Sequence, residues 1–251
     1  MTFTISVAGK GGVGKTTFAG LAVRHLSETT GEVVLAVDAD PNSNLGEKLG
    51  TSPGRTLGEI REDMLAEGDE QLKGVSKQER IDYQIRLALK EGKGFDLLTM
   101  GRQEGPGCYC YVNNMLRTII DALADKYSYS VIDNEAGMEH LSRRTTRRSD
   151  VLFVLHDGSK ASLAAAARIS SLADQMKLKI GRRVLVQNMV GMDSAEGKVA
   201  VLEGFDSSYG VRRSSIIQSR MRETDSIMEI PRTDPAFSDV TKLVDAERKR
   251  V

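Results

Sequence analysis

Residues 9–16 read GKGGVGKT and match the phosphate-binding pattern G-x-x-x-x-G-K-[ST]. The apolar segment FTISVA precedes the match and an amphipathic segment starting at Lys15 follows it, which is the strand-to-helix context of a phosphate loop. Glycines let the backbone curl with its N–H groups inward, and the following helix N-terminus favours phosphate. Lys15 is expected to bridge the β- and γ-phosphates, and the Thr16 hydroxyl to bind Mg²⁺. The residues predicted to contact a nucleotide here are Gly11, Gly12, Val13, Gly14, Lys15, Thr16 and Thr17.

A second chemical feature is GPGCYC at 105–110, which holds the two cysteines of the chain, Cys108 and Cys110. The pair follows the apolar run FDLLTM and precedes apolar residues at helical spacing, so it is predicted to lie where a loop opens a helix. A helix N-terminus lowers the pKa of a thiol, which makes both cysteines good metal ligands.

Three alternatives stay open for these cysteines: two unrelated buried residues, a redox dithiol, which is more usually C-x-x-C, and ligands of an iron–sulfur cluster. The histidines lie outside the segment and are expected at surface or core positions: His25, His140 and His156.

The elements that must position these residues follow from the hydrophobic pattern. Short apolar, β-branched runs alternate with longer amphipathic stretches, which predicts an α/β fold with a mostly parallel, twisted sheet and helices on both faces. Residues 1–251 are predicted to form a single P-loop NTPase domain, in which the charged stretch 54–92 is a helical insertion at the sheet edge. Strands are predicted at 3–8, 33–38, 95–100, 129–133, 151–155 and 183–190, and a helix at 15–27.

The composition favours no highly charged partner. Lys and Arg together number 35, as do Asp and Glu, so the net charge is zero and neither nucleic acid nor an anionic membrane is expected as a partner. The start has no secretory pattern and the chain has no run of about 18 apolar residues, so a cytoplasmic location is expected. Local basic clusters are expected to be solvated faces, with docking onto an acidic partner as the alternative. They comprise RRTTRR at 143–148, and Arg212, Arg213, Arg220 and Arg222.

The lysine inside the phosphate loop, Lys10, resembles the signature lysine of the deviant Walker A ATPases, the class that contains nitrogenase iron protein, the septum-positioning and plasmid-partition ATPases and the arsenite pump ATPase. The resemblance implies a homodimer in which Lys10 reaches the nucleotide of the other subunit. VVLAVDADPNSN resembles switch I of the class, which places Asp38 near Mg²⁺ and makes Asp40 the residue that orients the attacking water. VIDNEAG resembles the Walker B and switch II segment, with Asp133 holding Mg²⁺ through water and Gly137 contacting the γ-phosphate.

Two further segments resemble the base-binding part of that class. Asn188, at the end of RVLVQNMV, matches the adenine-reading asparagine and offers a donor and an acceptor to the base. EIPRTDP resembles the loop that would place Pro231 and Arg232 beside the base. A strand-end asparagine is also a common turn residue, so that alternative stays open for Asn188.

The C-x-C between the FDLLTM and Walker B segments resembles the carbon monoxide dehydrogenase accessory ATPases, the CooC-type nickel-insertion proteins, and AGMEHLSRRT after Walker B does so too. This resemblance implies an ATPase that carries Ni²⁺, or Zn²⁺, to the Ni–Fe–S cluster of carbon monoxide dehydrogenase and cycles between ATP and ADP. We expect its hydrolysis to be slow and dimer-dependent. In a two-fold dimer, Cys108 and Cys110 of both chains would gather four thiolates around one ion.

Two other functions stay open. Electron transfer of the nitrogenase iron protein type needs an interfacial iron–sulfur cluster, but its second cluster cysteine after Walker B is missing from VIDNEAGMEH. A positional ATPase that binds DNA or membrane is the third candidate. The C-terminal VTKLVDAERKRV is basic at its end but lacks the bulky apolar face of a membrane-targeting helix, which argues against that function.

Overall fold

The computed structural model describes residues 2–67, 76–102, 110–123, 126–135, 148–191, 201–220, 224 and 226–251. The strands are β1 (Phe3–Gly9), β2 (Val34–Ala39), β3 (Leu89–Glu91), β4 (Phe95–Thr99), β5 (Tyr129–Asn134), β6 (Arg148–His156), β7 (Lys179–Val190) and β8 (Ser207–Arg212). The helices are α1 (Lys15–Thr30), α2 (Leu45–Lys48), α3 (Leu57–Glu67), α4 (Lys77–Ala88), α5 (Cys110–Leu123), α7 (Lys160–Gln175), α8 (Ser215–Arg220) and α9 (Pro235–Arg248).

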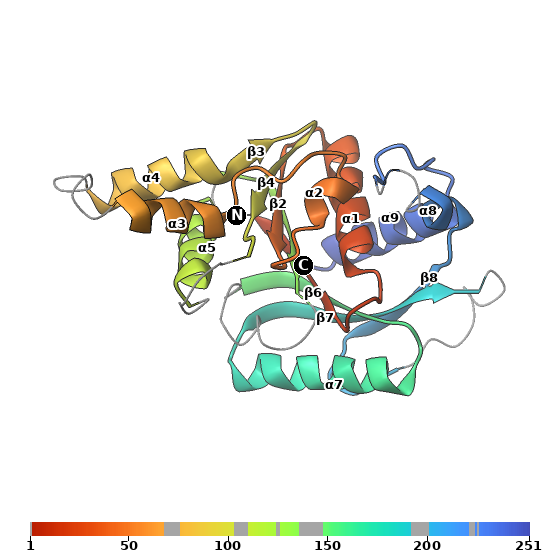
Figure 1. Ribbon diagram of the computed structural model, residues 1–251. Coiled ribbons are helices and arrows are strands. Elements are labelled where there is room, and N and C mark those ends of the chain that lie inside the picture. The colour runs from red at the N-terminus through yellow and green to blue at the C-terminus, as the bar shows by residue number, and fades with distance from the viewer. Residues whose placement is uncertain are drawn as a thin grey trace.

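These strands form one sheet in the order β3-β4-β2-β5-β1-β6-β7-β8 (Figure 1). Neighbours are parallel throughout, except that β3 pairs antiparallel with β4 at one edge. β1 lies between β5 and β6, with Val7 opposite Asp133 and Gly9 opposite Leu155. Parallel strands end at the same edge of a sheet, so the residues that follow β1, β2, β5 and β7 meet there. The predicted single-domain α/β fold is confirmed.

One face of the sheet is covered by α1, α2, α8 and α9, which share a single apolar core with the strands beneath them (Figure 1). Phe18 of α1 packs on Phe153 of β6 with ring centroids 5.2 Å apart, and Phe237 of α9 is buried in the same cluster. Each such side chain contributes about 1.5–3 kcal/mol on burial. This core anchors α1, and with it the loop at the N-terminus of α1.

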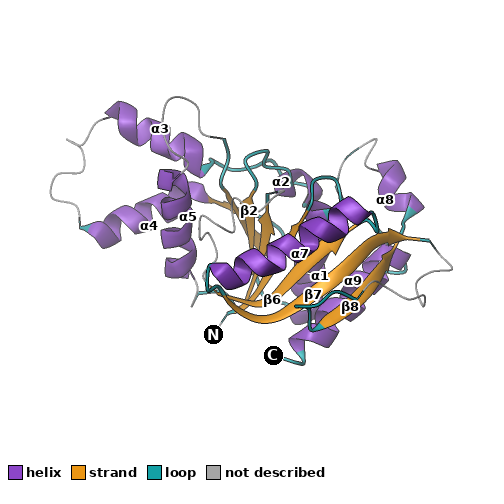
Figure 2. Cartoon of the chain, turned by 90° about the horizontal axis from the view of Figure 1, so that it is seen from below, coloured by secondary structure: helices purple, strands orange, loops and turns teal. Residues whose placement is uncertain are grey.

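The opposite face is covered in two parts. α7 lies over β6 and β7, as Figure 2 shows, and also packs on β1. α3, α4 and α5 pack on β2, β4 and β5. The charged stretch 54–92, which was predicted to be a helical insertion at the sheet edge, contains α3, α4 and the edge strand β3. Its side chains Leu57, Ile60, Ile85 and Ala88 are buried with those of α5. None of the helices in the described ranges is long and apolar enough to cross a membrane.

Candidate nucleotide site

The phosphate loop joins β1 to α1 at the carboxyl edge of the sheet. Gly9 leaves β1 with φ of 144°, and a Cβ atom built there would lie 2.4 Å from the carbonyl oxygen of Leu155 in β6. Gly14 caps α1 with φ of 89°, and its carbonyl oxygen accepts from the backbone N–H of Phe18 at 3.0 Å. Only glycine tolerates both the close approach and the left-handed conformation. The loop therefore lies tightly against β6, directly before the N-terminus of α1.

A polar cavity of about 490 Å³ lies over this loop. Lys15 is only 7% exposed in it, and its Nζ donates to the carbonyl oxygen of Lys10 at 3.3 Å. Burial lowers the pKa of Lys15, and the negative charges of Asp133, Asp40 and Glu135 oppose that shift. Phosphate oxygens would supply further negative charge to this amine. The cavity is lined by Gly11, Gly12, Gly14, Lys15, Thr16, Thr17, Asp40, Asn42, Asn44 and Lys48.

Two buried carboxyls lie side by side at the inner end of the site, because the register of β2 and β5 places Asp38 opposite Asp133. Burial raises the pKa of Asp38 to about 7, although the N–H of Leu45 donates to it at 2.8 Å. Burial and then the charge of Asp38 raise the pKa of Asp133 to about 7, against a hydrogen bond from Thr16.

Oδ1 of Asp133 is buried and has no hydrogen-bond partner in the part of the chain that the structure describes. A hydroxyl and two carboxylates are the oxygen ligands that Mg²⁺ prefers, directly or through water. Thr16, Asp38 and Asp133 therefore fit the metal role that the sequence assigns to them. A cation here would also neutralise the charge that burial disfavours.

Asp40 lies just beyond β2 and lines the polar cavity. Its Oδ1 accepts two hydrogen bonds from Asn42, one from the backbone N at 2.8 Å and one from Nδ2 at 3.0 Å. Sequence reasoning did not single out Asn42, Asn44 or Lys48. The polar tripeptide NSN after DADP was the available signal for the two asparagines.

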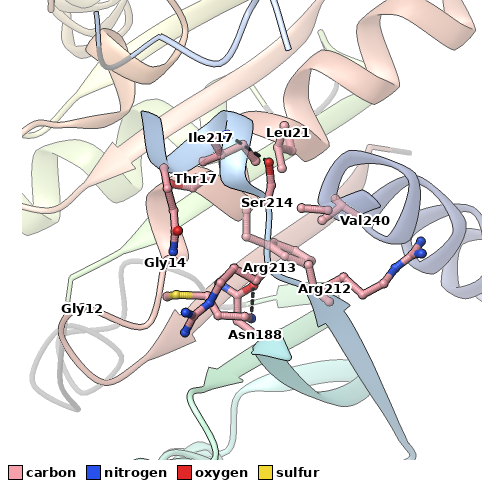
Figure 3. A pocket seen from close by; sticks show the side chains of 15 residues that line it. Gly12, Gly14, Thr17, Leu21, Asn188, Arg212, Arg213, Ser214, Ile217 and Val240 are labelled. Carbon is pink, nitrogen blue, oxygen red and sulfur yellow. Dashed lines mark hydrogen bonds between the residues drawn. The ribbon is translucent and has the colours of Figure 1, made fainter. Parts of the chain in front are cut away.

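An apolar cavity of about 180 Å³ continues from the loop between α1, α8, α9 and the ends of β7 and β8 (Figure 3). It shares the lining residues Gly12, Gly14 and Thr17 with the polar cavity, so the two cavities are neighbours at the phosphate loop. Its lining is Gly12, Gly14, Thr17, Phe18, Leu21, Asn188, Met189, Val211, Arg212, Arg213, Ser214, Ile217, Gln218, Ala236 and Val240.

Asn188 lines this apolar cavity and braces the phosphate loop. Its Nδ2 donates to the carbonyl oxygen of Val13 at 2.8 Å, and its Oδ1 accepts from the N–H of Met189 at 3.0 Å. A Cβ atom at Gly14 would lie 2.4 Å from that Nδ2, so the glycine makes room for the brace. One amide hydrogen and one lone pair of Asn188 remain for a base. Its reading of adenine stays a prediction.

Pro231 and Arg232 do not line this cavity, and their contact with a base stays a prediction. They are exposed, and Arg232 forms an ion pair with Glu28 at 2.6 Å. Glu28 lies about 20 Å along α1 from the phosphate loop, at 1.5 Å per residue. Arg212 and Arg213 line the cavity instead, at the end of a strand that the sequence pattern did not reveal.

The two arginines differ in their contacts. Arg212 extends toward α9 (Figure 3), where its Nε and Nη2 donate to Asp239 at 2.8 Å and 2.6 Å. The side chain of Arg213 is exposed and makes no hydrogen bond or ion pair with any residue in the described ranges. Arg213 is therefore available to a ligand.

Several predicted positions lie outside the described residues: Cys108, Gly137, His140, 143–147 and Arg222. Cys110 begins α5, in line with the predicted helix start, although its side chain is likewise not described. Lys10 is exposed on the loop. Within the described ranges, no three His, Cys, Asp or Glu side chains are grouped so that they could hold a metal ion.

The two described histidines have structural contacts. His25 Nε2 lies 3.0 Å from Asp245 Oδ1, which ties α1 to α9. His156 is fully buried, and its Nδ1 accepts from the N–H of Gly158 at 3.1 Å.

The sequence of this chain matches a known family and known proteins. Residues 2–186 match the model of a family described as AAA domain. The chain is 50% identical over 188 residues to the uncharacterized ATP-binding protein MJ0685 of Methanocaldococcus jannaschii, covering 74% of each chain. It is 33% identical over 186 residues to the carbon monoxide dehydrogenase accessory protein CooC of Rhodospirillum rubrum, covering 70% of each.

The fold is shared with a ParA family ATPase from Chlorobium tepidum TLS, with a TM-score of 0.70 at 17% identity over 97% of this chain and 98% of that one. The family model spans well over half of the chain and both relatives exceed 30% identity over more than two thirds of it. This protein therefore belongs to the AAA-domain family of P-loop NTPases that includes CooC.

Proposed function

We propose that this protein binds ATP with Mg²⁺ and hydrolyses it to ADP and phosphate. The observation that carries the proposal is that a polar and an apolar cavity lie side by side at the phosphate loop, where both are lined by Gly12, Gly14 and Thr17. The polar cavity holds a buried lysine, and the other is small and mostly apolar. A nucleoside triphosphate has the same two-part character, with charged phosphates and a flat base.

The side chains at this site have separate roles in hydrolysis. Lys15 neutralises phosphate charge at the helix N-terminus, and Thr16 with Asp38 and Asp133 would hold Mg²⁺. When bound, that ion stabilises charge that develops on the phosphate oxygens. Asp40 orients the attacking water and accepts its proton.

Lys10 is the proposed link between hydrolysis and dimerisation. It lies exposed at the phosphate loop, where a second copy of the chain facing the loop would meet it. A lysine supplied across a two-fold interface would complete the charge of each site only in the dimer. The rate of hydrolysis per chain should therefore be slow and should rise with protein concentration.

The test compares Asp40→Ala with Lys15→Ala. Asp40→Ala should bind ATP with the parent affinity and hydrolyse it at least about 100-fold more slowly, since one positioned acid–base group is typically worth that factor. Lys15→Ala should lose ATP affinity. Asp174→Ala, which changes an exposed carboxylate paired with Arg183, is the matched control and should keep both properties. Parent-rate hydrolysis by Asp40→Ala would refute the assigned role.

We propose further that the cargo is a soft divalent metal, Ni²⁺ or Zn²⁺, bound by Cys108 and Cys110 of two chains and delivered to carbon monoxide dehydrogenase. Support comes from the 33% identity to CooC, which is named as an accessory protein of that enzyme, and from the start of α5 at Cys110. Four thiolates suit a tetrahedral Zn²⁺ or, when flattened, Ni²⁺.

Equilibrium dialysis beside sedimentation tests the shared metal site. One ion per dimer is expected, with binding lost in the Cys108→Ala/Cys110→Ala variant while ATP affinity stays at the parent value. One ion per chain, or unchanged binding in that variant, would refute it. Visible absorbance with iron and acid-labile sulfide after anaerobic purification would instead favour the iron–sulfur alternative.

A further inference from the structure

We propose that Arg102 and Asn42 are positioning residues that hold the Asp40 carboxylate in the orientation needed to accept a proton from the attacking water. The inference rests on the proposed ATP hydrolysis and extends it to two residues outside the phosphate loop. It is carried by a chain of hydrogen bonds that links the end of β4 to the edge of the polar cavity.

The chain has two links. Arg102 Nη2 donates to Asn42 Oδ1 at 2.6 Å, across 60 residues of sequence. Asn42 Nδ2 then donates to Asp40 Oδ1 at 3.0 Å, and the Asn42 backbone N donates to the same oxygen at 2.8 Å. Arg102 does not touch Asp40, so it acts only through the amide of Asn42.

The consequence for Asp40 is an asymmetric carboxylate. Its Oδ1 is occupied by two donors, whereas its Oδ2 accepts no hydrogen bond from any residue in the described ranges. Asp40 and Asn42 both line the polar cavity. The pair of bonds fixes the rotation of the carboxylate and leaves one oxygen for water. A general base gains from such fixing because proton transfer requires hydrogen-bond geometry.

The backbone around Arg102 is shaped to place it there. The N–H of Met100 donates to the carbonyl oxygen of Asp38 at 2.8 Å, which ties the end of β4 to the end of β2. Gly101 follows with φ of 70°, and a Cβ atom there would come within 2.3 Å of the Thr56 side chain. The chain therefore turns at a position that only glycine accepts, and this turn delivers Arg102 to the segment after β2.

The positive charge of Arg102 should strengthen both hydrogen bonds of the Asn42 amide. A guanidinium donor forms a stronger hydrogen bond than a neutral one, and a polarised amide is in turn a better donor on its other side. Arg102 is exposed, so its contribution to folding stability is small. Its effect should appear in catalysis rather than in stability.

Steady-state ATPase kinetics with separate Mg²⁺–ATP binding measurements test the relay. Arg102→Ala and Asn42→Ala should each lower kcat about tenfold, with KM and ATP affinity within about twofold of the parent, as expected for loss of an effect exerted only in the transition state. Arg102→Lys, which keeps the charge, should recover most of the rate. Arg220→Ala, which breaks an exposed ion pair with Glu229, is the matched control and should match the parent.

A double-mutant cycle identifies the route. In an Asp40→Ala background, Arg102→Ala should cost no further rate, because its effect passes through that carboxylate. Parent-rate hydrolysis by Arg102→Ala, an equal loss in both backgrounds, or a loss confined to KM would each overturn the relay. These results leave the proposed ATPase function intact, whereas parent-rate hydrolysis by Asp40→Ala alone would overturn the assigned base and the relay together.

Discussion

Replacing Asp133 by Asn should flatten the pH dependence of stability of the protein without nucleotide or Mg²⁺. Asp38 and Asp133 are buried side by side, and burial raises the pKa of each from 3.8 to about 7. A carboxyl whose pKa is higher in the folded state contributes stability that is fully present below its unfolded pKa. That contribution is lost as the pH rises through the folded value. The parent protein should therefore become less stable between pH 5 and pH 8.

The magnitude follows from the two pKa values of one carboxyl. One pKa unit corresponds to about 1.4 kcal/mol, so a carboxyl with pKa 3.8 unfolded and about 7 folded loses about 2–3 kcal/mol of stability between pH 5 and pH 8. The Asp133→Asn variant lacks this pH-dependent loss of stability, because an asparagine side chain does not ionise. It also removes a negative charge beside Asp38, so the ionisation of Asp38 becomes less costly. Between pH 5 and pH 8, the fall in the free energy of unfolding should therefore be smaller in the variant than in the parent, by at least about 2 kcal/mol.

The assay is urea unfolding at pH 5 and pH 8 in the presence of a chelator. Asp174→Asn is the control, because a hydrogen bond from Arg183 lowers the pKa of Asp174 and its titration lies below this interval. Adding Mg²⁺–ADP at pH 8 should restore the parent but not Asp133→Asn, since the cation favours the ionised carboxyls. If parent and variant lose equal stability between the two pH values, the paired-carboxyl reasoning and the cation site built on it are both wrong.

Three further changes probe other parts of the site and fold. Arg213→Ala should weaken ATP binding about fivefold by removing a cation that can stack on the base. Displacement of a fluorescent nucleotide measures the affinity for ATP. Tripolyphosphate, which has no base, should bind to the variant with the parent affinity. Asn188→Ala should weaken ATP and tripolyphosphate alike by about tenfold, because the Val13 carbonyl of the phosphate loop loses its brace; a loss confined to ATP would indicate a role in base reading alone. Glu247→Ala should lower the free energy of unfolding by about 3 kcal/mol, since it leaves the ion-pair partner Arg182 without its buried carboxylate. Urea unfolding measures this, and a free energy of unfolding within about 1 kcal/mol of the parent value would argue against the prediction.

The sequence alone determined the features that depend on neighbouring residues. The phosphate loop needs glycines, a lysine and a hydroxyl at set spacing, and the structure places Lys15 and Thr16 at the start of α1 as that spacing predicts. The buried strands β1, β2, β4, β5, β6 and β7 were predicted because parallel strands covered on both faces are apolar along their length. The ends of the observed strands differ from the predicted ends by at most a few residues, and the largest difference is at β7, which begins at Lys179 instead of 183.

Only the tertiary structure decided what lies beside what. β8 reads SSYGVR and lacks a continuous apolar run, so its pairing with β7 could not be predicted. The position of Arg212 and Arg213 in the lining of the apolar cavity was missed for the same reason. Pro231 and Arg232 matched a motif by local order, whereas the ion pair of Arg232 with Glu28 of α1 is visible only in the tertiary structure. Likewise, the adjacency of Asp38 to Asp133 and the reach of Arg102 to Asn42 arise from strand order. Strand order is set by long-range packing of whole faces, which no short segment of the chain encodes.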